Sequence, residues 1–134
     1  MYEVRVEADF AAAHFLQDYN GKCENLHGHN YKVLAHARGK NLNEGGMLLD
    51  FTYLKGALRK VCKELDHTNL NDNPYFKQNP SAERICRYIF DAIIADCKAN
   101  GLNLEKQDPD GEKVYLWKVD VFETDTSRAR YCVD

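Results

Sequence analysis

The residues in this chain best suited to chemistry are those from Cys23 to His29, which read Cys-Glu-Asn-Leu-His-Gly-His. Side chains of a β-strand alternate between its two faces, so His27 and His29 are expected to project from the same face. Each imidazole can then offer a nitrogen to one metal ion, and imidazole is a common zinc ligand. The alternative is a polar loop without a metal. Convergence with a further histidine favours the zinc site.

His14 is the candidate for a third ligand. Residues 2–13 alternate between apolar and charged side chains, which predicts a half-buried antiparallel strand. If the alternation continues by one step, His14 joins the apolar face of this strand. A histidine on such a face is either a hydrogen-bonded core residue or a ligand.

A second strand is predicted over about His27–Arg38, with its odd-numbered residues on the apolar face. It follows a polar loop over residues 15–26 that contains the turn signal Asn-Gly. Antiparallel strands joined by this loop bring His14 next to the histidine pair. That convergence is the main physical argument for a site with three histidines. His36 falls on the opposite face and is predicted to be an ordinary surface residue.

Two helices are predicted in the middle of the chain. Asp50 can cap a helix over about residues 51–65, and Ser81 can cap a second helix that runs to about Ala99. Apolar residues recur along one stripe of each helix, as expected for helices that pack one side against a sheet.

Residues 114–123 are predicted to form a strand, and Glu123 continues its core-facing row. A carboxylate in such a row is costly unless it has a partner, so Glu123 is either partnered or turned into water. The tail, residues 124–134, could form a last short strand. This order, ββααββ, predicts one α+β domain over residues 1–134, an antiparallel four-stranded sheet with both helices packed on one face. Its open edges predict oligomerisation.

Composition narrows the class of protein. The 134 residues carry a net charge of −3, which argues against a general nucleic-acid binder. The first residues contain no apolar signal core, and no apolar run is long enough to span a membrane. Five cysteines, an odd number without a paired framework, fit a reducing compartment. We therefore expect a cytoplasmic protein with neither nucleic acid nor membrane as partner.

Six motifs make the chain similar to the family of 6-pyruvoyl-tetrahydropterin and 6-carboxy-tetrahydropterin synthases, in its bacterial queuosine-pathway branch. They are residues 10–14, Cys23-x-x-x-His27-Gly28-His29, residues 46–51, residues 65–71, residues 80–83, and Glu123-Thr124 followed by residues 127–131. The resemblance implies the tunnelling fold, in which subunits join their sheets into a trimeric barrel. Two trimers stack into a homohexamer with active sites between subunits.

The resemblance also implies zinc held by His14, His27 and His29, and 7,8-dihydroneopterin triphosphate as the substrate. Three neutral imidazoles leave a position open on zinc, as a catalytic site requires. The metal would polarise oxygens of the substrate side chain and acidify the adjacent C–H bond.

Further roles follow from the same resemblance. Cys23 corresponds to the base, and a nearby cation favours its thiolate. Asp66 and His67 resemble the proton relay, although a plain helix end is the alternative for this pair. Glu123, with Thr124, resembles the group that accepts the N–H edge of the pterin.

Contacts to the triphosphate are less specific in the sequence. Arg128 and Arg130 are candidates, and a solvated charged surface is the alternative for each. Glu24 is a departure from the family pattern. A carboxylate beside the cysteine resembles variants that cleave the side chain to 6-hydroxymethyl-dihydropterin, a folate precursor. Glu24 is then an alternative base, and a plain exposed carboxylate is the other interpretation.

The expected activity is that of a zinc-dependent lyase. It converts the triphosphate substrate to 6-carboxy-5,6,7,8-tetrahydropterin and releases acetaldehyde and triphosphate. Two alternatives lie within the same family, namely formation of 6-pyruvoyl-tetrahydropterin and the cleavage suggested by Glu24. An alternative of another class is a non-catalytic module that binds a pterin or zinc, in which the histidines are structural.

Overall fold

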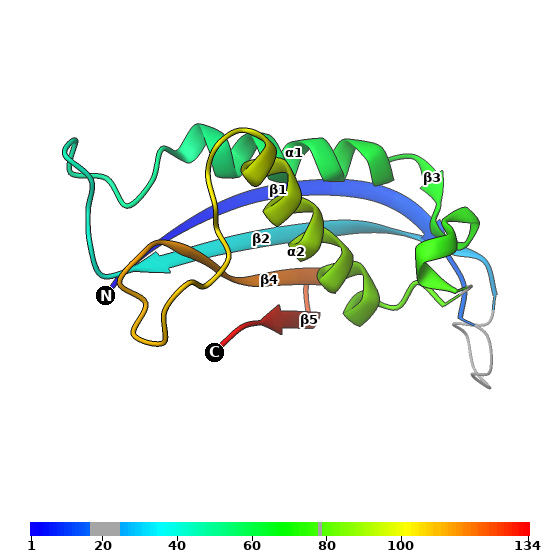
Figure 1. Cartoon of the computed structure of the whole chain (residues 1–134). Coiled ribbons are helices and arrows are strands. Elements are labelled where there is room, and N and C mark those ends of the chain that lie inside the picture. Colours follow the sequence, from blue (N-terminus) through cyan, green and yellow to red (C-terminus); the bar gives the residue numbers. More distant parts are fainter. Residues whose placement is uncertain (17–24, 78) are drawn as a thin grey trace.

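The computed structural model describes residues 1–16, 25–77 and 79–134, so Cys23 and Glu24 lie outside the described residues. These described residues form two long strands, two helices and three shorter strands (Figure 1). In chain order they are β1 (Tyr2–His14), β2 (His27–Gly39), α1 (Phe51–Leu65), β3 (Thr68–Asn69), α2 (Ala82–Ala99), β4 (Tyr115–Thr124) and β5 (Ser127–Cys132). Two single 3₁₀ turns, η2 (Leu70–Asp72) and η3 (Pro74–Phe76), connect β3 to α2.

The strands form one sheet in the order β3-β1-β2-β4-β5. Neighbouring strands are antiparallel except β1 and β3, which pair in parallel at Ala12–Thr68 and Ala13–Asn69. The prediction of a four-stranded sheet was therefore wrong by one strand among the described residues. A two-residue strand is too short to leave an alternating pattern in the sequence, and its pairing depends on the path that the chain takes after α1.

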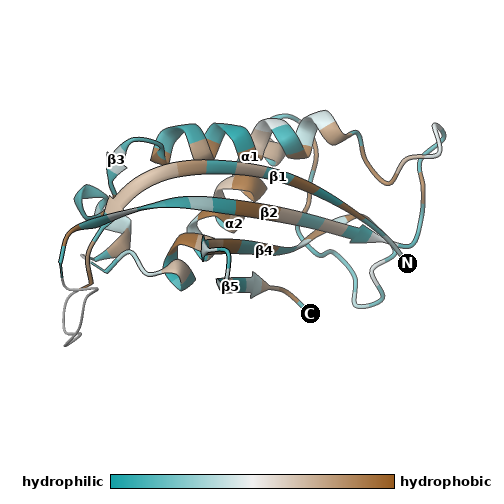
Figure 2. Ribbon diagram, turned by 180° about the vertical axis from the view of Figure 1, so that it is seen from behind, coloured by the Kyte–Doolittle hydropathy of each residue, from teal (hydrophilic) through white to brown (hydrophobic). Residues whose placement is uncertain are grey.

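Both helices lie on one face of the sheet, as predicted, with α1 against β1 and α2 against β4 and β5 (Figure 1). Each begins at the predicted cap. The Asp50 side chain accepts a hydrogen bond from the Thr52 N–H, and the Ser81 side chain accepts one from the Arg84 N–H. Each helix carries hydrophilic and hydrophobic residues along its length (Figure 2), as expected when only one side is buried.

The core lies between the sheet and the helices. Its strand residues are the alternate ones, such as Val6, Phe10, Val33 and Ala35, and all four are at most 3% exposed. The same alternation places His14 on this buried side at 0% exposure. The apolar faces of β1 and β2 thus extend to the histidines at one end of the sheet.

A β-bulge in β4 changes which side Trp117 faces. The pairing between β2 and β4 is interrupted after His36–Lys118 and resumes at Ala37–Leu116, which leaves Trp117 unpaired. Leu116, Val119 and Val121 therefore face the core, whereas the Trp117 ring lies on the other face against His36. Strict alternation along the predicted strand over residues 114–123 would place Trp117 in the core row with Val119, and the extra residue of the bulge reverses this.

His36 is not the ordinary surface residue predicted from the sequence, because it is only 7% exposed. Its Nδ1 lies 3.0 Å from Glu3 Oε2, and its Nε2 lies 3.7 Å from Asp120 Oδ2. It does face away from the helices, but side chains of the neighbouring strands cover it. Burial lowers the pKa of His36, and this outweighs the nearby Glu3, which raises it.

We expect the free energy of unfolding to decrease as the pH falls below about 6.5, the ordinary histidine value. The unfolded chain takes up the His36 proton more readily than the folded chain, so acid favours unfolding. The stabilising contribution is complete above that value and is lost as the pH falls towards the pKa of the folded state. Denaturant unfolding of the parent and of His36→Gln over a pH series measures it. Parallel curves for the two proteins would contradict the prediction.

Candidate metal centre

Four side chains converge at the end of the sheet next to β3. They are His14, His27, His29 and Glu123, and one potential ligand atom from each lies within 4.8 Å of the other three. His14 Nε2 is 3.0 Å from His27 Nε2, and Glu123 Oε1 is 2.9 Å from His29 Nε2. Glu123 Oε1 is also 3.8 Å from His14 Nε2. The structure therefore brings together the three predicted histidines and adds Glu123 to them.

Strand register places these groups. His14 pairs with His27 across the antiparallel β1–β2 ladder, and Ala12 pairs with His29. Side chains with the same parity on paired strands lie on one face, so the three imidazoles meet. Glu123 arrives at the same end because β4 is the other neighbour of β2.

Two backbone carbonyls orient the rings. His14 Nδ1 lies 2.9 Å from the carbonyl oxygen of Pro80, and His27 Nδ1 lies 2.5 Å from that of Asn25. A proton on each Nδ1 satisfies these contacts and leaves each Nε2 unprotonated and directed at the cluster. A hydrogen bond from the ring nitrogen that does not bind the metal to a backbone carbonyl is usual for histidines that bind metals.

The geometry at His29 tests whether these groups suit a metal ion. Its buried Nε2 has no hydrogen-bond partner among the described residues, although Glu123 Oε1 is only 2.9 Å away. A buried ring nitrogen without a hydrogen-bond partner is available to bind a metal ion. Burial lowers the pKa of His29 and outweighs the nearby Glu123 carboxylate, which raises it, whereas His14 and His27 add to the lowering. A neutral imidazole is the form that binds a metal, so this donor set fits zinc.

The Tyr31 ring packs beneath the cluster. Its ring is 0% exposed, stacks on Phe10 with centroids 4.8 Å apart, and meets the rings of His14 and His29 edge-on. Burial raises the pKa of the Tyr31 hydroxyl, which therefore stays protonated. Sequence reasoning placed Tyr31 only in an apolar row. The edge-on contacts with Tyr31 limit how far the rings of His14 and His29 can turn.

Asp66 and His67 lie directly before β3, on the side of β1 that faces away from β2. Asp66 Oδ2 is 2.7 Å from His67 Nδ1, and Asp66 Oδ1 accepts a hydrogen bond of 2.8 Å from the Ala11 N–H. The Ala11 bond is the largest of the effects that lower the pKa of Asp66. His67 has a φ of 57°, which is unusual for a residue other than glycine, and its side chain is 83% exposed. The backbone thus presents a carboxylate-paired imidazole to the outside of this chain.

Two hollows border the cluster. His29 and His67 line the first, of about 530 Å³, together with residues 11–13 and 68–69. Glu123 lines the second, of about 330 Å³, together with Glu83 and residues 127–130. Sequence reasoning missed Glu83 as a site residue, because a carboxylate in the first turn of a helix is already explained by the helix dipole.

Arg128 and Arg130, the candidates for triphosphate contacts, line the second hollow but also face Asp120. Arg130 contacts both Asp120 oxygens, at 2.6 and 3.2 Å, and Arg128 Nη1 lies 3.7 Å from Oδ1. Burial opposes the charge on Asp120, but the Arg130 contact outweighs it and the pKa of Asp120 is lowered. Thr124 is exposed at the end of β4, and its hydroxyl accepts a hydrogen bond from the Thr126 N–H.

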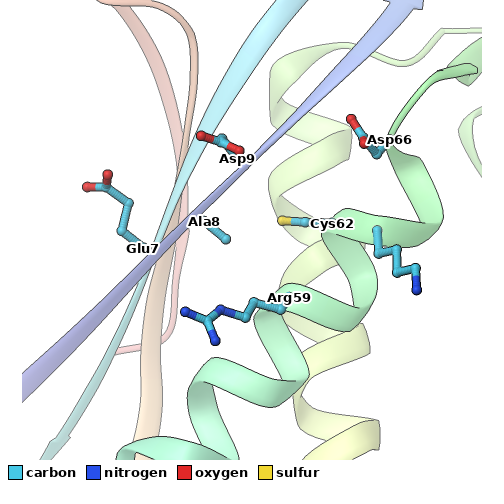
Figure 3. Close-up of a pocket in the computed structure, with 7 residues that line it drawn as sticks. Glu7, Ala8, Asp9, Arg59, Cys62 and Asp66 are labelled. Atoms are coloured by element: carbon cyan, nitrogen blue, oxygen red, sulfur yellow. The ribbon is translucent and has the colours of Figure 1, made fainter.

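A third hollow, of about 400 Å³, lies between β1 and α1 and is separate from the cluster (Figure 3). Glu7, Asp9, Arg59 and Asp66 surround it, and the Cys62 thiol lies in its wall. Burial raises the pKa of Cys62 to about 12, so this thiol stays protonated near neutral pH. It offers no thiolate, which is the form needed to bind a metal or accept a proton.

The 6-pyruvoyl tetrahydropterin synthase family model matches residues 3–133. This protein belongs to the 6-pyruvoyl tetrahydropterin synthase family. A 6-carboxy-5,6,7,8-tetrahydropterin synthase from Synechocystis is 35% identical, over 98% of this chain and 93% of that protein. The human 6-pyruvoyl tetrahydrobiopterin synthase is also 35% identical, over 96% of this chain and 90% of its own length. The family therefore includes relatives of equal similarity that are named for different pterin products.

Solved structures agree with this assignment. The 6-pyruvoyl tetrahydropterin synthase of Caenorhabditis elegans superposes with a TM-score of 0.75 and 26% identity, covering 99% of this chain and 96% of that one. This family has the tunnelling fold, which confirms the predicted fold class. No helix among the described residues is long and apolar enough to cross a membrane.

Proposed function

We propose that this protein is a zinc-dependent lyase that converts 7,8-dihydroneopterin triphosphate to 6-carboxy-5,6,7,8-tetrahydropterin, with release of acetaldehyde and triphosphate. The observation that carries the proposal is the cluster of three imidazoles and one carboxylate in a chain of this family. Several bacterial and archaeal relatives named for the 6-carboxy product support this choice over the other products. Queuosine biosynthesis, in the cytoplasm, is the pathway that we propose for it.

His14, His27 and His29 would hold the zinc ion, and Glu123 beside them would stay available to bind the substrate. Bound zinc supplies Lewis-acid polarisation of the substrate's side-chain oxygens, which makes the adjacent C–H bond easier to deprotonate. Burial lowers the pKa of His29, which favours the neutral form of this imidazole that binds a metal.

Proton transfer is assigned to Cys23 and to the Asp66–His67 pair. We propose that Cys23 accepts the proton of the activated C–H bond, an assignment that comes from the family motif. Asp66 holds the His67 ring through Nδ1 at 2.7 Å, which leaves Nε2 free to exchange a proton with the substrate. Because the His67 side chain is 83% exposed, we propose that it serves the active site of a neighbouring subunit.

Binding of the pterin is assigned to the hollow that contains Glu83 and Glu123. A pterin presents an edge of parallel N–H donors, and a carboxylate accepts two such bonds side by side. Arg128 and Arg130 are at the same hollow, but Asp120 already neutralises part of their charge. We therefore propose that they contribute to triphosphate binding mainly through long-range electrostatic attraction and less through direct contacts.

A homohexamer built from two trimers would complete the sites. The outer side of β1 is paired with β3 only at its last residues, and β5 is the opposite edge of the sheet. Unpaired strand edges favour addition of another strand. Glu7 and Asp9 near the β1 edge (Figure 3) and Arg128 and Arg130 on β5 have opposite charges, which favours pairing β1 of one subunit with β5 of the next.

Product analysis tests the proposed reaction. We expect incubation of the zinc-loaded protein with 7,8-dihydroneopterin triphosphate to yield acetaldehyde and 6-carboxy-tetrahydropterin in equal amounts, as measured by mass spectrometry. Formation of 6-pyruvoyl-tetrahydropterin without acetaldehyde would contradict the 6-carboxy assignment. Absence of any turnover would favour a non-catalytic module that binds a pterin or zinc.

Glu24 gives a specific reason to keep a second product in the assay. A Plasmodium vivax 6-pyruvoyltetrahydropterin synthase structure, 28% identical with a TM-score of 0.72, is described as a mutant of a catalytic glutamate residue. Glu24 lies beside Cys23 in the sequence and could act as an alternative base. Recovery of 6-hydroxymethyl-dihydropterin from the parent, but not from Glu24→Gln, would assign that role to Glu24.

A further inference from the structure

The buried side chain of Asn71 clamps the backbone of Phe15, the residue that follows His14, through two hydrogen bonds. Asn71 Oδ1 accepts a hydrogen bond of 2.8 Å from the Phe15 N–H, and Asn71 Nδ2 donates one of 3.0 Å to the Phe15 carbonyl. The amide therefore pairs with both polar groups of a single backbone residue, as a strand residue would. It extends the β1–β3 ladder beyond the pairs at Ala12 and Ala13.

Asn71 is itself held firmly. It is 3% exposed, its N–H donates to the Asn69 side chain at 3.1 Å, and the preceding Leu70 is 1% exposed in the core. Asn71 also lies five residues after Asp66, whose carboxylate accepts the Ala11 N–H. The segment 66–71 thus contacts β1 along the whole stretch that ends at Phe15.

The clamp lies next to a proposed ligand at the end of a strand. His14 is the last residue of β1, so the regular ladder ends there. Its ring is oriented by the Pro80 carbonyl, and its backbone position depends on the neighbours on either side. On the β2 side this neighbour is His27, and beyond the end of β3 it is Asn71.

We propose that Asn71 is a positioning residue of the metal centre, which holds the end of β1 so that His14 Nε2 meets the other ligands. This inference rests on the proposed zinc site. The clamp needs one donor and one acceptor at fixed places, which a side-chain amide provides. An aspartate would keep the acceptor and the shape, but it would direct a carboxylate oxygen at the Phe15 carbonyl.

Asn71→Asp is the test variant, and Asn73→Asp is its matched control. Asn73 lies two residues away, and its side chain accepts a hydrogen bond from the Tyr75 N–H and donates none to any described residue, so aspartate can replace it. Both variants add the same charge to the same segment. We expect Asn71→Asp to weaken zinc binding about 10- to 100-fold, as loss of an outer-shell partner typically does. Asn73→Asp should bind zinc as the parent does.

Zinc affinity is measured by competition with a chelator, and the d–d absorption of the Co²⁺-loaded protein reports the ligand geometry without any activity assay. We expect a changed Co²⁺ spectrum for Asn71→Asp alone. If this variant does not fold, Asn71→Ser, which is smaller and uncharged, takes its place.

Each outcome decides the inference. Parent-like affinity and spectrum in a folded Asn71 variant would show that the clamp is only structural and would leave the proposed function standing. Equal weakening by Asn73→Asp would assign the effect to charge and overturn the inference. A parent protein that binds no zinc would overturn the proposed function and, with it, this inference.

Discussion

His29→Ala is expected to lose both bound zinc and turnover. The metal content of the purified parent should be close to one ion per chain, and in the variant it should fall nearly to zero. The lowered pKa keeps the His29 imidazole neutral, and its buried Nε2 has no hydrogen-bond partner among the described residues, so metal binding is the role that accounts for it. Two imidazoles remain in the variant, a weaker set of zinc ligands than the original three.

His36→Ala is the matched control for the metal assay. It removes an imidazole from the same strand, but His36 faces the other side of the sheet and contacts Glu3 and Asp120. Zinc content measured by atomic emission should therefore stay at the parent level. Unchanged zinc in His29→Ala, or equal loss in both variants, would mean that the ligands are misassigned.

Cys23→Ala is expected to lower kcat by about 100- to 10,000-fold, the usual contribution of a general base, while zinc stays bound. The substitution removes the proton acceptor and leaves all four groups of the cluster in place. The parent rate should also fall at acid pH, because protonation of the thiolate removes the base. Steady-state kinetics with a parallel metal assay measures both effects.

Cys132→Ala is the control for this experiment, because Cys132 is an exposed free thiol on β5 and has no assigned role. It should turn over substrate as the parent does. If Cys23→Ala also behaves like the parent in every assay, the hypothesis that the protein is an enzyme is contradicted, and a binding module without catalysis accounts better for the result. A flat rate profile from mildly acid to neutral pH would remove only the assignment of the thiolate as base.

The long strands and the capped helices were predictable because their signals are local. Alternation over residues 2–13 sets the faces of β1, and antiparallel pairing then determines where His14 meets His27. The same logic placed Glu123 in the core-facing row. These predictions need only the period of a strand and the direction of its neighbour.

The parts that could not be predicted depend on contacts between distant residues. Asn71 and Phe15 are 56 residues apart, and His14 and Pro80 are 66 apart, so no periodic pattern reveals either hydrogen bond. The bulge at Trp117 inserts one residue and so changes which residues of β4 face the core, and no glycine or proline in the sequence signals it. Burial of His36 requires Glu3 and Trp117 to cover it, which only the assembled sheet shows.

Family resemblance added what spacing alone could not provide. Periodicity brings three imidazoles and a carboxylate to one region, but it does not select a substrate. Relatives of equal identity are named for 6-carboxy and for 6-pyruvoyl products, so the choice of product depends on features beyond the shared cluster. Glu24 and the hollow with Glu83 are the places where we expect that choice to be made.

The most direct test of the central claim is anomalous diffraction from crystals of the zinc-loaded protein, recorded above and below the zinc absorption edge. The account predicts one strong anomalous peak per chain, about 2.0–2.1 Å from the Nε2 atoms of His14, His27 and His29. A peak at any other place, or none at these three nitrogens in a protein that contains zinc by elemental analysis, would contradict it.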